Sequence, residues 1–315
     1  MRRALIVGID KYPDFPLQGC VNDAKRLANV LERHHDGKLN FQCEIVTSPP
    51  HSITRAFLRK KINDLFSQPA DVAFFHFSGH GTINGLGGYL VTPDFVDYDV
   101  GVSMSEVLAL ANQAKVKEVF ITLDCCHSGA FGSVPAISND RVVLSEGVSV
   151  ITATRSGQEA IEVGGGGVFT SLLVEALEGG ASGLLGEVSA ASVYAYIDNA
   201  MGAWDQRPLF KANVDRFVRL RDAAPKIEIT LLCQLTKYFP LPAEELSLSP
   251  EYEPTVEPHD KNKEAVFRDL VKLRHAGLVE PIGEEHMYFA AISSKTCALT
   301  ALGKYYWRLV NEKKL

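Results

Sequence analysis

Short apolar runs alternate with amphipathic stretches over the first two thirds of the chain. The apolar runs are rich in β-branched and aromatic residues and are bounded by Gly, Asp or Pro, which is typical of buried strands. They cover residues 4–9, 43–46, 72–77, 119–123 and 148–153. Helical spacing of apolar positions lies between them, at residues 22–34, 53–66, 103–114, 169–177 and 189–201. This alternation predicts an α/β fold, a mostly parallel sheet with helices on both faces.

The pattern changes after about residue 222. Residues 240–258 contain five prolines and several glutamates, so we predict an extended, solvated connection over residues 223–260. Residues 262–276 then show helical spacing up to a glycine, residues 287–292 suit one strand of a hairpin, and residues 299–310 suit a last helix. This order predicts a small winged-helix-like domain over residues 261–315.

The composition is that of an ordinary globular protein. The 315 residues are 46% hydrophobic and 22% charged, which excludes a disordered or fibrous chain. A net charge of −6 gives no reason to expect nucleic acid or an anionic membrane as the main partner. We expect no signal peptide and no membrane span. Six scattered cysteines in a chain large enough to fold without disulfides predict a reducing compartment, the cytoplasm.

Two strand ends carry residues suited to nucleophilic catalysis. One apolar run leads into Ser-Gly-His-Gly at 78–81, and another leads into Asp-Cys-Cys-His-Ser-Gly at 124–129. Because the carboxyl ends of parallel strands meet at one edge of a sheet, these segments can lie together. A cysteine peptidase needs a thiolate, a histidine that takes and returns a proton, and amide donors for the oxyanion. Because both residues follow strand ends, a catalytic pair is favoured over a cysteine and a histidine that have separate structural roles.

These segments resemble those of the caspase-like cysteine peptidases, specifically the metacaspases and their bacterial relatives. The resemblance rests on FFHFSGHG at 74–81, ITLDCCHSGAFG at 121–132, GCVNDAKRL at 19–27 and GVFTSLLVEAL at 167–177. It implies a caspase–haemoglobinase fold and endopeptidase activity over a peptidase domain of residues 1–222. Within that domain, residues 1–131 are similar to a large subunit, 132–147 to a linker and 148–222 to a small subunit.

The resemblance also implies roles for single residues. His80 is expected to be the catalytic histidine, and Cys126 matches the nucleophile, the third residue of the family's D-x-C-H-S-G pattern. Cys125 would then be a small core residue. The backbone N–H groups of Gly81 and Cys126 are expected to form the oxyanion hole. His127 follows the motif and is expected to have a local structural role.

Two acidic residues predict the substrate specificity. The Q-A-C-[RQG]-G motif of caspases, which cut after Asp, is absent. Asp124 precedes the nucleophile by two residues. The resemblance to metacaspases implies that Asp23 corresponds to an aspartate of their substrate pocket. Two carboxylates in a pocket would bind a cationic P1 side chain and repel an acidic one, so we expect cleavage after Arg or Lys. The alternatives are that Asp23 caps a helix and that Asp124 bonds a neighbouring loop.

The calcium site of metacaspases is not expected in this chain. Residues 101–105 read Gly-Val-Ser-Met-Ser where the family carries an acidic pair, and Ser133 stands in place of another acid. Calcium requires several hard oxygen ligands with carboxylate charge, so we predict no metal and no other cofactor. Asp94, Asp97 and Asp99 form a nearby acidic cluster that suits either a cation site or a solvated loop.

Regulation and partners follow from the remaining segments. Arg141 in the linker could be cut by the enzyme itself or by an activating protease, or it is an ordinary exposed arginine. Lys263, Arg268, Lys272 and Arg274 on one predicted helix leave DNA binding open. A protein-interaction or autoinhibitory module is favoured for the tail, so nucleic acid and membranes are not expected partners.

Protein substrates and a sensor protein are the partners that we expect. The resemblance suggests a defence pathway, such as antiviral defence, or a programmed-death pathway. Two rival functions stay open at this point. The first is a caspase-fold peptidase with another P1 preference, and the second is a DNA-binding or scaffold protein whose peptidase domain is vestigial.

Overall fold

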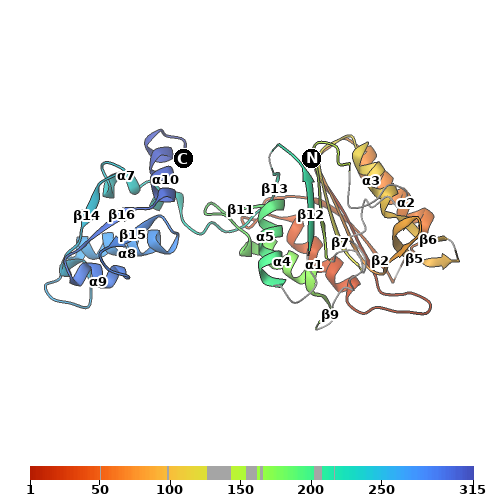
Figure 1. Ribbon diagram of the computed structural model, residues 1–315, viewed down its shortest axis with the longest axis horizontal. Coiled ribbons are helices and arrows are strands. Elements are labelled where there is room, and N and C mark those ends of the chain that lie inside the picture. Colours follow the sequence, from red (N-terminus) through yellow and green to blue (C-terminus); the bar gives the residue numbers. More distant parts are fainter. Residues whose placement is uncertain are drawn as a thin grey trace. The chain divides into compact units, whose positions relative to one another are not determined.

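The computed structural model describes residues 1–49, 51–97, 99–125, 143–153, 162–163, 166–201, 208–215 and 217–315. The chain divides into two compact units, Met1–Ala224 and Pro225–Leu315. Figure 1 shows the elements of both units in the colours of the sequence.

A six-stranded sheet forms the centre of the first unit, in the order β12-β8-β7-β3-β1-β2. Its strands are β1 (Arg2–Ile9), β2 (Gln42–Ser48), β3 (Ala70–Ser78), β7 (Val116–Asp124), β8 (Val148–Thr152) and β12 (Leu209–Asn213). All neighbours pair in parallel except the edge strand β12, which runs antiparallel to β8. The apolar runs of the sequence are therefore the buried strands of a mostly parallel sheet, which confirms the predicted fold class.

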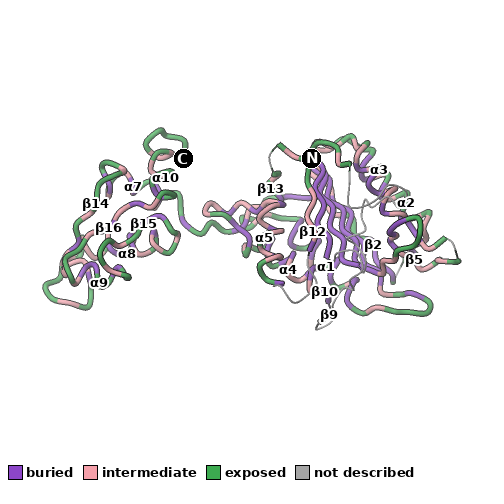
Figure 2. Tube along the Cα trace, in the orientation of Figure 1, coloured by how far each residue is buried: buried purple, intermediate pink, exposed green. Residues whose placement is uncertain are grey.

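Helices cover both faces of this sheet and divide its core into two clusters. One cluster combines sheet residues with α1 (Cys20–Glu32), α4 (Val168–Glu175), the π-helix η2 (Ala176–Gly180) and α5 (Ala190–Met201). The other combines the opposite sheet face with α2 (Arg55–Ser67) and α3 (Met104–Asn112). Successive strand residues alternate between the clusters, so Phe74 belongs to the first and Phe75 to the second. Figure 2 shows the buried strands between helices whose outer faces are exposed.

A smaller antiparallel sheet follows β3 directly. It consists of β4 (Gly81–Asn84), β5 (Gly87–Val96) and β6 (Asp99–Ser103) in that order. Gly101 has a φ of 151°, and a Cβ there would lie 2.0 Å from the Leu90 carbonyl oxygen, so only glycine fits. Two short pairs complete the first unit: β9 (Glu162–Val163) with β10 (Gly166–Gly167), and β11 (Glu187–Ser189) with β13 (Arg219–Asp222).

The second unit holds a three-stranded antiparallel sheet in the order β14-β16-β15. The strands are β14 (Glu245–Ser247), β15 (Val279–Ile282) and β16 (Thr296–Leu299). The helices are α6 (Ile229–Leu232), α7 (Leu235–Tyr238), η3 (Pro250–Tyr252), α8 (Lys261–His275), α9 (Met287–Ile292) and α10 (Ala301–Asn311). None of the helices in the described parts of either unit is both long enough and apolar enough to cross a membrane.

The structure corrects two predictions for this unit. The segment 223–260 is not an extended connection, because β14 pairs with β16 and both Phe239 and Leu248 are buried. Residues 287–292 form helix α9 instead of a strand, because Met287, Ala290 and Ala291 are the buried positions, which is helical spacing. The winged-helix-like domain over residues 261–315 stays a prediction.

A buried histidine lies in β3, four residues before the predicted catalytic histidine. The Nδ1 atom of His76 lies 2.9 Å from Oγ1 of Thr122 on the neighbouring strand. Its side chain is fully buried, and this burial lowers its pKa from 6.5 to about 3. The folded unit therefore holds a neutral imidazole where the unfolded chain would readily take up a proton.

We predict that His76 makes the first unit sensitive to acid. Its pKa is lower in the folded state, so its contribution to stability is complete above pH 6.5 and is lost as the pH falls from 6.5 towards 3. At about 1.4 kcal/mol for each pKa unit, the loss should be about 2 kcal/mol at pH 5. Urea unfolding at pH 7 and pH 5 measures this loss for the wild type and for His76→Leu. The variant should lose about 2 kcal/mol less, and equal losses would contradict the prediction.

Candidate active site

The register between β3 and β7 sets the position of the candidate site. Ser78 pairs with Asp124, and the Gly79 N–H donates a hydrogen bond of 3.3 Å to the Asp124 carbonyl oxygen. His80 follows Ser78 by two residues at this edge of the sheet. Cys125 is buried, as expected for a core residue. The predicted nucleophile Cys126 lies outside the described residues, and so do His127, Ser133 and Arg141.

The His80 imidazole is held by a backbone carbonyl. Its Nε2 lies 2.6 Å from the carbonyl oxygen of Phe15, in the loop between β1 and α1. A carbonyl oxygen only accepts hydrogen bonds, so Nε2 carries the proton of the neutral ring. Nδ1 is then the atom that can accept a proton from a substrate or from a neighbouring nucleophile.

Gly81 begins the edge strand β4 with its amide directed away from β5. The Val91 N–H donates to the His80 carbonyl oxygen at 2.9 Å, so His80 and Val91 face each other as a hydrogen-bonded pair of the hairpin. Gly81 and Leu90 form the next pair. Hydrogen-bonded and non-hydrogen-bonded pairs alternate in antiparallel strands, so Gly81 belongs to a non-hydrogen-bonded pair and its N–H points to the side opposite β5. This orientation suits an oxyanion donor.

Asp23 and Asp124 converge on the first turn of α4. Both side chains are buried. Oδ2 of Asp23 accepts a hydrogen bond of 2.8 Å from the Gly167 N–H, and Oδ2 of Asp124 accepts from the N–H and hydroxyl of Thr170 at 3.2 and 2.7 Å. A Cβ on Gly167 would lie 2.2 Å from Asp124 Oδ2 and 3.3 Å from Asp23 Oδ2. The structure therefore brings both carboxylates together at a positive helix end.

The contacts of the two aspartates test their alternative roles. Asp23 lies inside α1 and does not cap it, because Oδ1 of Asp10 accepts the hydrogen bonds from the N–H groups of Cys20 and Val21. Asp124 accepts hydrogen bonds from Thr170, which lies in helix α4 and not in a loop. A cation already lies beside one carboxylate, since Nη1 of Arg26 is 3.8 Å from Oδ1 of Asp23. The site thus combines two buried carboxylates with the Arg26 guanidinium beside one of them.

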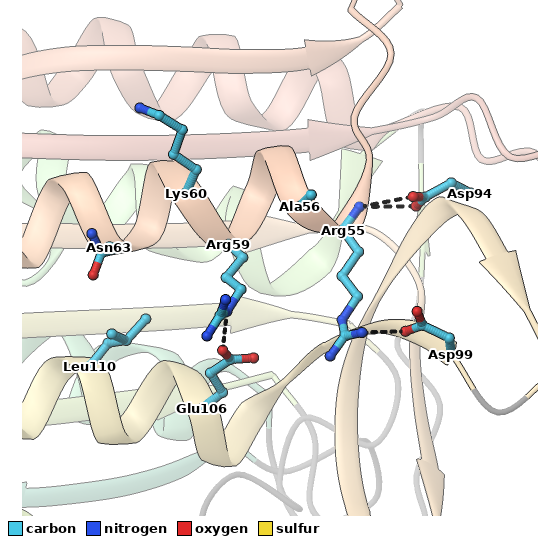
Figure 3. Close-up of a pocket in the computed structure, with 9 residues that line it drawn as sticks. All are labelled: Arg55, Ala56, Arg59, Lys60, Asn63, Asp94, Asp99, Glu106 and Leu110. Carbon is cyan, nitrogen blue, oxygen red and sulfur yellow. Dashed lines mark hydrogen bonds and ion pairs between the residues drawn. The ribbon is translucent and has the colours of Figure 1, made fainter.

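Two acids of the cluster after the histidine loop, Asp94 and Asp99, are bonded to Arg55. Asp94 accepts hydrogen bonds from the Arg55 N–H at 3.0 and 3.2 Å, and Asp99 forms an ion pair of 2.8 Å with the Arg55 guanidinium. These contacts lie in a groove of about 830 Å³ between α2, α3 and the β5–β6 hairpin. Figure 3 shows them together with the ion pair between Arg59 and Glu106. Within the described ranges, no group of three or more His, Cys, Asp or Glu side chains could hold a metal ion.

Four contributions to the site were not predicted from the sequence. They come from Tyr12, which packs edge-on against the His80 ring, the Phe15 carbonyl, Arg26 and Thr170. Thr170 lies in the segment GVFTSLLVEAL that carried part of the family resemblance, so that segment contained a signal. Tyr12 and Phe15 lie in a loop with no motif, and Phe15 acts through its backbone, which no residue type reveals.

Curated relatives are similar to part of this sequence. Metacaspase-1 of Pyricularia oryzae is 29% identical over 199 residues, which cover 54% of this chain and 48% of that protein. Metacaspase-1 of Emericella nidulans is 28% identical over 163 residues, 46% of this chain and 40% of that protein. The chain thus spans about half the length of the curated relatives it matches.

Solved structures support the same fold at low sequence identity. Caspase-1 from Spodoptera frugiperda superposes with a TM-score of 0.52 at 14% identity, covering 70% of this chain and 90% of that one. A structural genomics target from Geobacter sulfurreducens has a TM-score of 0.52 at 18% identity, covering 71% of this chain and 97% of that one. The model of the caspase domain matches residues 1–217. This match covers more than half of the sequence, and the chain therefore belongs to the caspase domain family.

Proposed function

We propose that this protein is a cysteine endopeptidase that cleaves protein substrates after Arg or Lys. The observation that carries the proposal is the orientation of His80, whose Nε2 is bonded to the Phe15 carbonyl so that Nδ1 is left to accept a proton. Membership of the caspase domain family and the likeness to metacaspases support the reaction class.

The proposed reaction uses Cys126 and His80 in two stages. Nδ1 of His80 takes the proton of the Cys126 thiol, and the thiolate attacks the scissile carbonyl carbon. The N–H groups of Gly81 and Cys126 stabilise the tetrahedral oxyanion. His80 returns the proton to the leaving amine as the C–N bond breaks, and it then activates a water molecule that hydrolyses the thioester. The Phe15 carbonyl stabilises the imidazolium that forms in each stage.

The proposed P1 pocket uses the buried carboxylates of Asp23 and Asp124. Hydrogen bonds from the first turn of α4 hold Oδ2 of each carboxylate in place. A substrate guanidinium or ammonium group would then meet a preorganised anionic site. The position of Arg26 beside Asp23 shows that a guanidinium can approach this carboxylate.

We propose a regulatory or protein-interaction role for the second unit. Two of the four basic residues that suggested DNA binding are engaged inside the unit: Lys263 pairs with Glu251, and Arg274 donates to the Glu285 carbonyl oxygen. This favours a protein partner, such as a sensor or an activating protease that cuts at Arg141. A role in antiviral defence or programmed death, in the cytoplasm, belongs to the same proposal.

We predict that both Cys126 and His80 are essential for peptide cleavage. Fluorogenic peptides with Arg, Lys or Asp at P1 should be cleaved only after the basic residues, because the pocket charge repels an acidic side chain. Cys126→Ala and His80→Ala should each lower kcat/KM by about 10⁴-fold or more, to the assay background. Cleavage after Asp would refute the pocket assignment, and activity in Cys126→Ala would refute the nucleophile and with it the proposed function.

We predict that Asp23→Asn selectively weakens cleavage after basic residues. Asparagine keeps an oxygen that can accept from the Gly167 N–H but removes the charge, so kcat/KM for a P1 Arg peptide should fall about 30-fold or more. Asp64, whose half-buried side chain pairs with Lys60 far from the proposed pocket residues in the sequence, offers the matched control Asp64→Asn. The control should retain wild-type rates. An Asp23→Asn enzyme that cleaves P1 Arg peptides as fast as this control would refute the role of Asp23.

We predict that peptide cleavage does not depend on calcium. Two acids close to the expected site in the sequence, Asp94 and Asp99, are already engaged by Arg55. Initial rates with a chelator and with millimolar calcium should therefore agree within about twofold. Loss of activity in the chelator, restored by calcium, would show that the chain builds a calcium site from other residues.

A further inference from the structure

The hydroxyl of Tyr12 bridges His80, which directly precedes β4, to Val91 on β5. The His80 N–H donates to Tyr12 Oη at 3.0 Å, and Tyr12 Oη in turn donates to the Val91 carbonyl oxygen at 3.2 Å. The Val91 N–H donates back to the His80 carbonyl oxygen at 2.9 Å. Both backbone polar groups of His80 are thus held in one closed ring of three hydrogen bonds.

Tyr12 takes the place of a missing bond of the β4–β5 ladder. Gly81 pairs with Leu90, so His80 and Val91 are the next residues across the hairpin. A hydrogen-bonded pair in an antiparallel hairpin ordinarily exchanges two direct N–H···O=C bonds. Here the bond from the Val91 N–H is direct, whereas the Tyr12 hydroxyl lies between the His80 N–H and the Val91 carbonyl oxygen. The hairpin is therefore held open at His80 by a side chain from another part of the chain.

The tyrosine is itself firmly held. Its side chain is only 3% exposed, and burial raises its pKa well above the ordinary value, so the hydroxyl stays protonated and can donate. The surrounding loop is fixed at both ends, because the Lys11 N–H donates to the Ser48 carbonyl oxygen and the Leu17 N–H donates to the Asp10 carbonyl oxygen. The same loop supplies the Phe15 carbonyl that bonds Nε2 of His80.

The glycine before His80 also reflects this arrangement. A Cβ on Gly79 would lie 2.6 Å from the Tyr12 hydroxyl oxygen, which is closer than such atoms can approach. In addition, the Tyr12 and His80 rings meet edge-on with their centroids 4.6 Å apart. One side chain therefore contacts the backbone, the ring and the preceding residue of the histidine.

We propose that Tyr12 is a positioning residue for catalysis, whose inserted hydroxyl sets the place and tautomer of the His80 imidazole. This inference rests on the proposed peptidase function. Without the hydroxyl, the His80 N–H and the Val91 carbonyl either lose a partner or close into a direct bond of about 2.9 Å. Either change moves the imidazole relative to the Phe15 carbonyl, and displacements of about 1 Å can cost about 100-fold in rate.

The test compares Tyr12→Phe with Tyr196→Phe. Both variants keep the ring and lose one hydroxyl, but the Tyr196 hydroxyl donates to the exposed Glu175 on the other face of the sheet. With a P1 Arg peptide, Tyr12→Phe should lower kcat by about tenfold or more while KM changes by less than about threefold, because substrate binding does not involve the hydroxyl. Tyr196→Phe should match the wild type. A Tyr12→Phe enzyme with wild-type kcat would overturn the proposal.

A second measurement does not require activity. In Cys126→Ala protein with ¹⁵N-labelled histidine, the imidazole ¹⁵N shifts report which nitrogen of His80 carries the proton, and the spectrum of His80→Gln identifies its signals. The Nε2–H form should dominate, and it should give way to a mixture when Tyr12→Phe is added. Unchanged shifts would overturn the proposal even in a protein that cleaves no peptide.

A further variant covers the case in which Tyr12→Phe fails to fold. Gly79→Ala keeps the hydroxyl but pushes a methyl group against it, so it should perturb the same ¹⁵N signals and lower kcat in the same direction. Wild-type signals and wild-type kcat in Gly79→Ala would count against the proposal.

Discussion

The parallel pairing of β3 with β7 is the constraint on which the candidate site depends. It joins residues 46 positions apart, from Ala70↔Val116 to Ser78↔Asp124, and closing such a separation costs conformational entropy that only burial can offset. Two clusters on opposite faces of the sheet provide that burial. A shift of one residue would exchange Phe74 and Phe75 between the clusters, so the core fixes the register that places the histidine loop.

The sequence predicted those strands that are buried on both faces of the sheet. The runs that became β1, β3, β7 and β8 are apolar at most positions because helices cover both faces of the sheet, and this signal is hard to mistake. The β4–β6 sheet was missed because its exposed positions and its glycines interrupt any period. Segment 287–292 was misassigned because six residues do not distinguish alternation from helical spacing unless the buried positions are known.

The parts of the candidate site that depend on side-chain chemistry were predicted from sequence motifs. Asp23 and Asp124 were recognised as acids in motifs, and the structure brings them together at Gly167. The interactions that orient His80 could not be predicted in this way. One uses a backbone carbonyl, which any residue type provides, and the other uses a tyrosine whose partners are themselves backbone groups. Such contacts depend on the path of the chain in three dimensions.

The carboxylates at the start of α4 also join two stretches of the polypeptide. Asp23 and Asp124 belong to the first 125 residues, whereas Gly167 and Thr170 belong to the stretch after the region that resembles an intersubunit linker. β8 pairs with β7 across the same division. A chain severed between the two stretches would therefore persist as a non-covalent heterodimer. Its seam would run through the proposed P1 pocket, whose two carboxylates would then also hold the two fragments together.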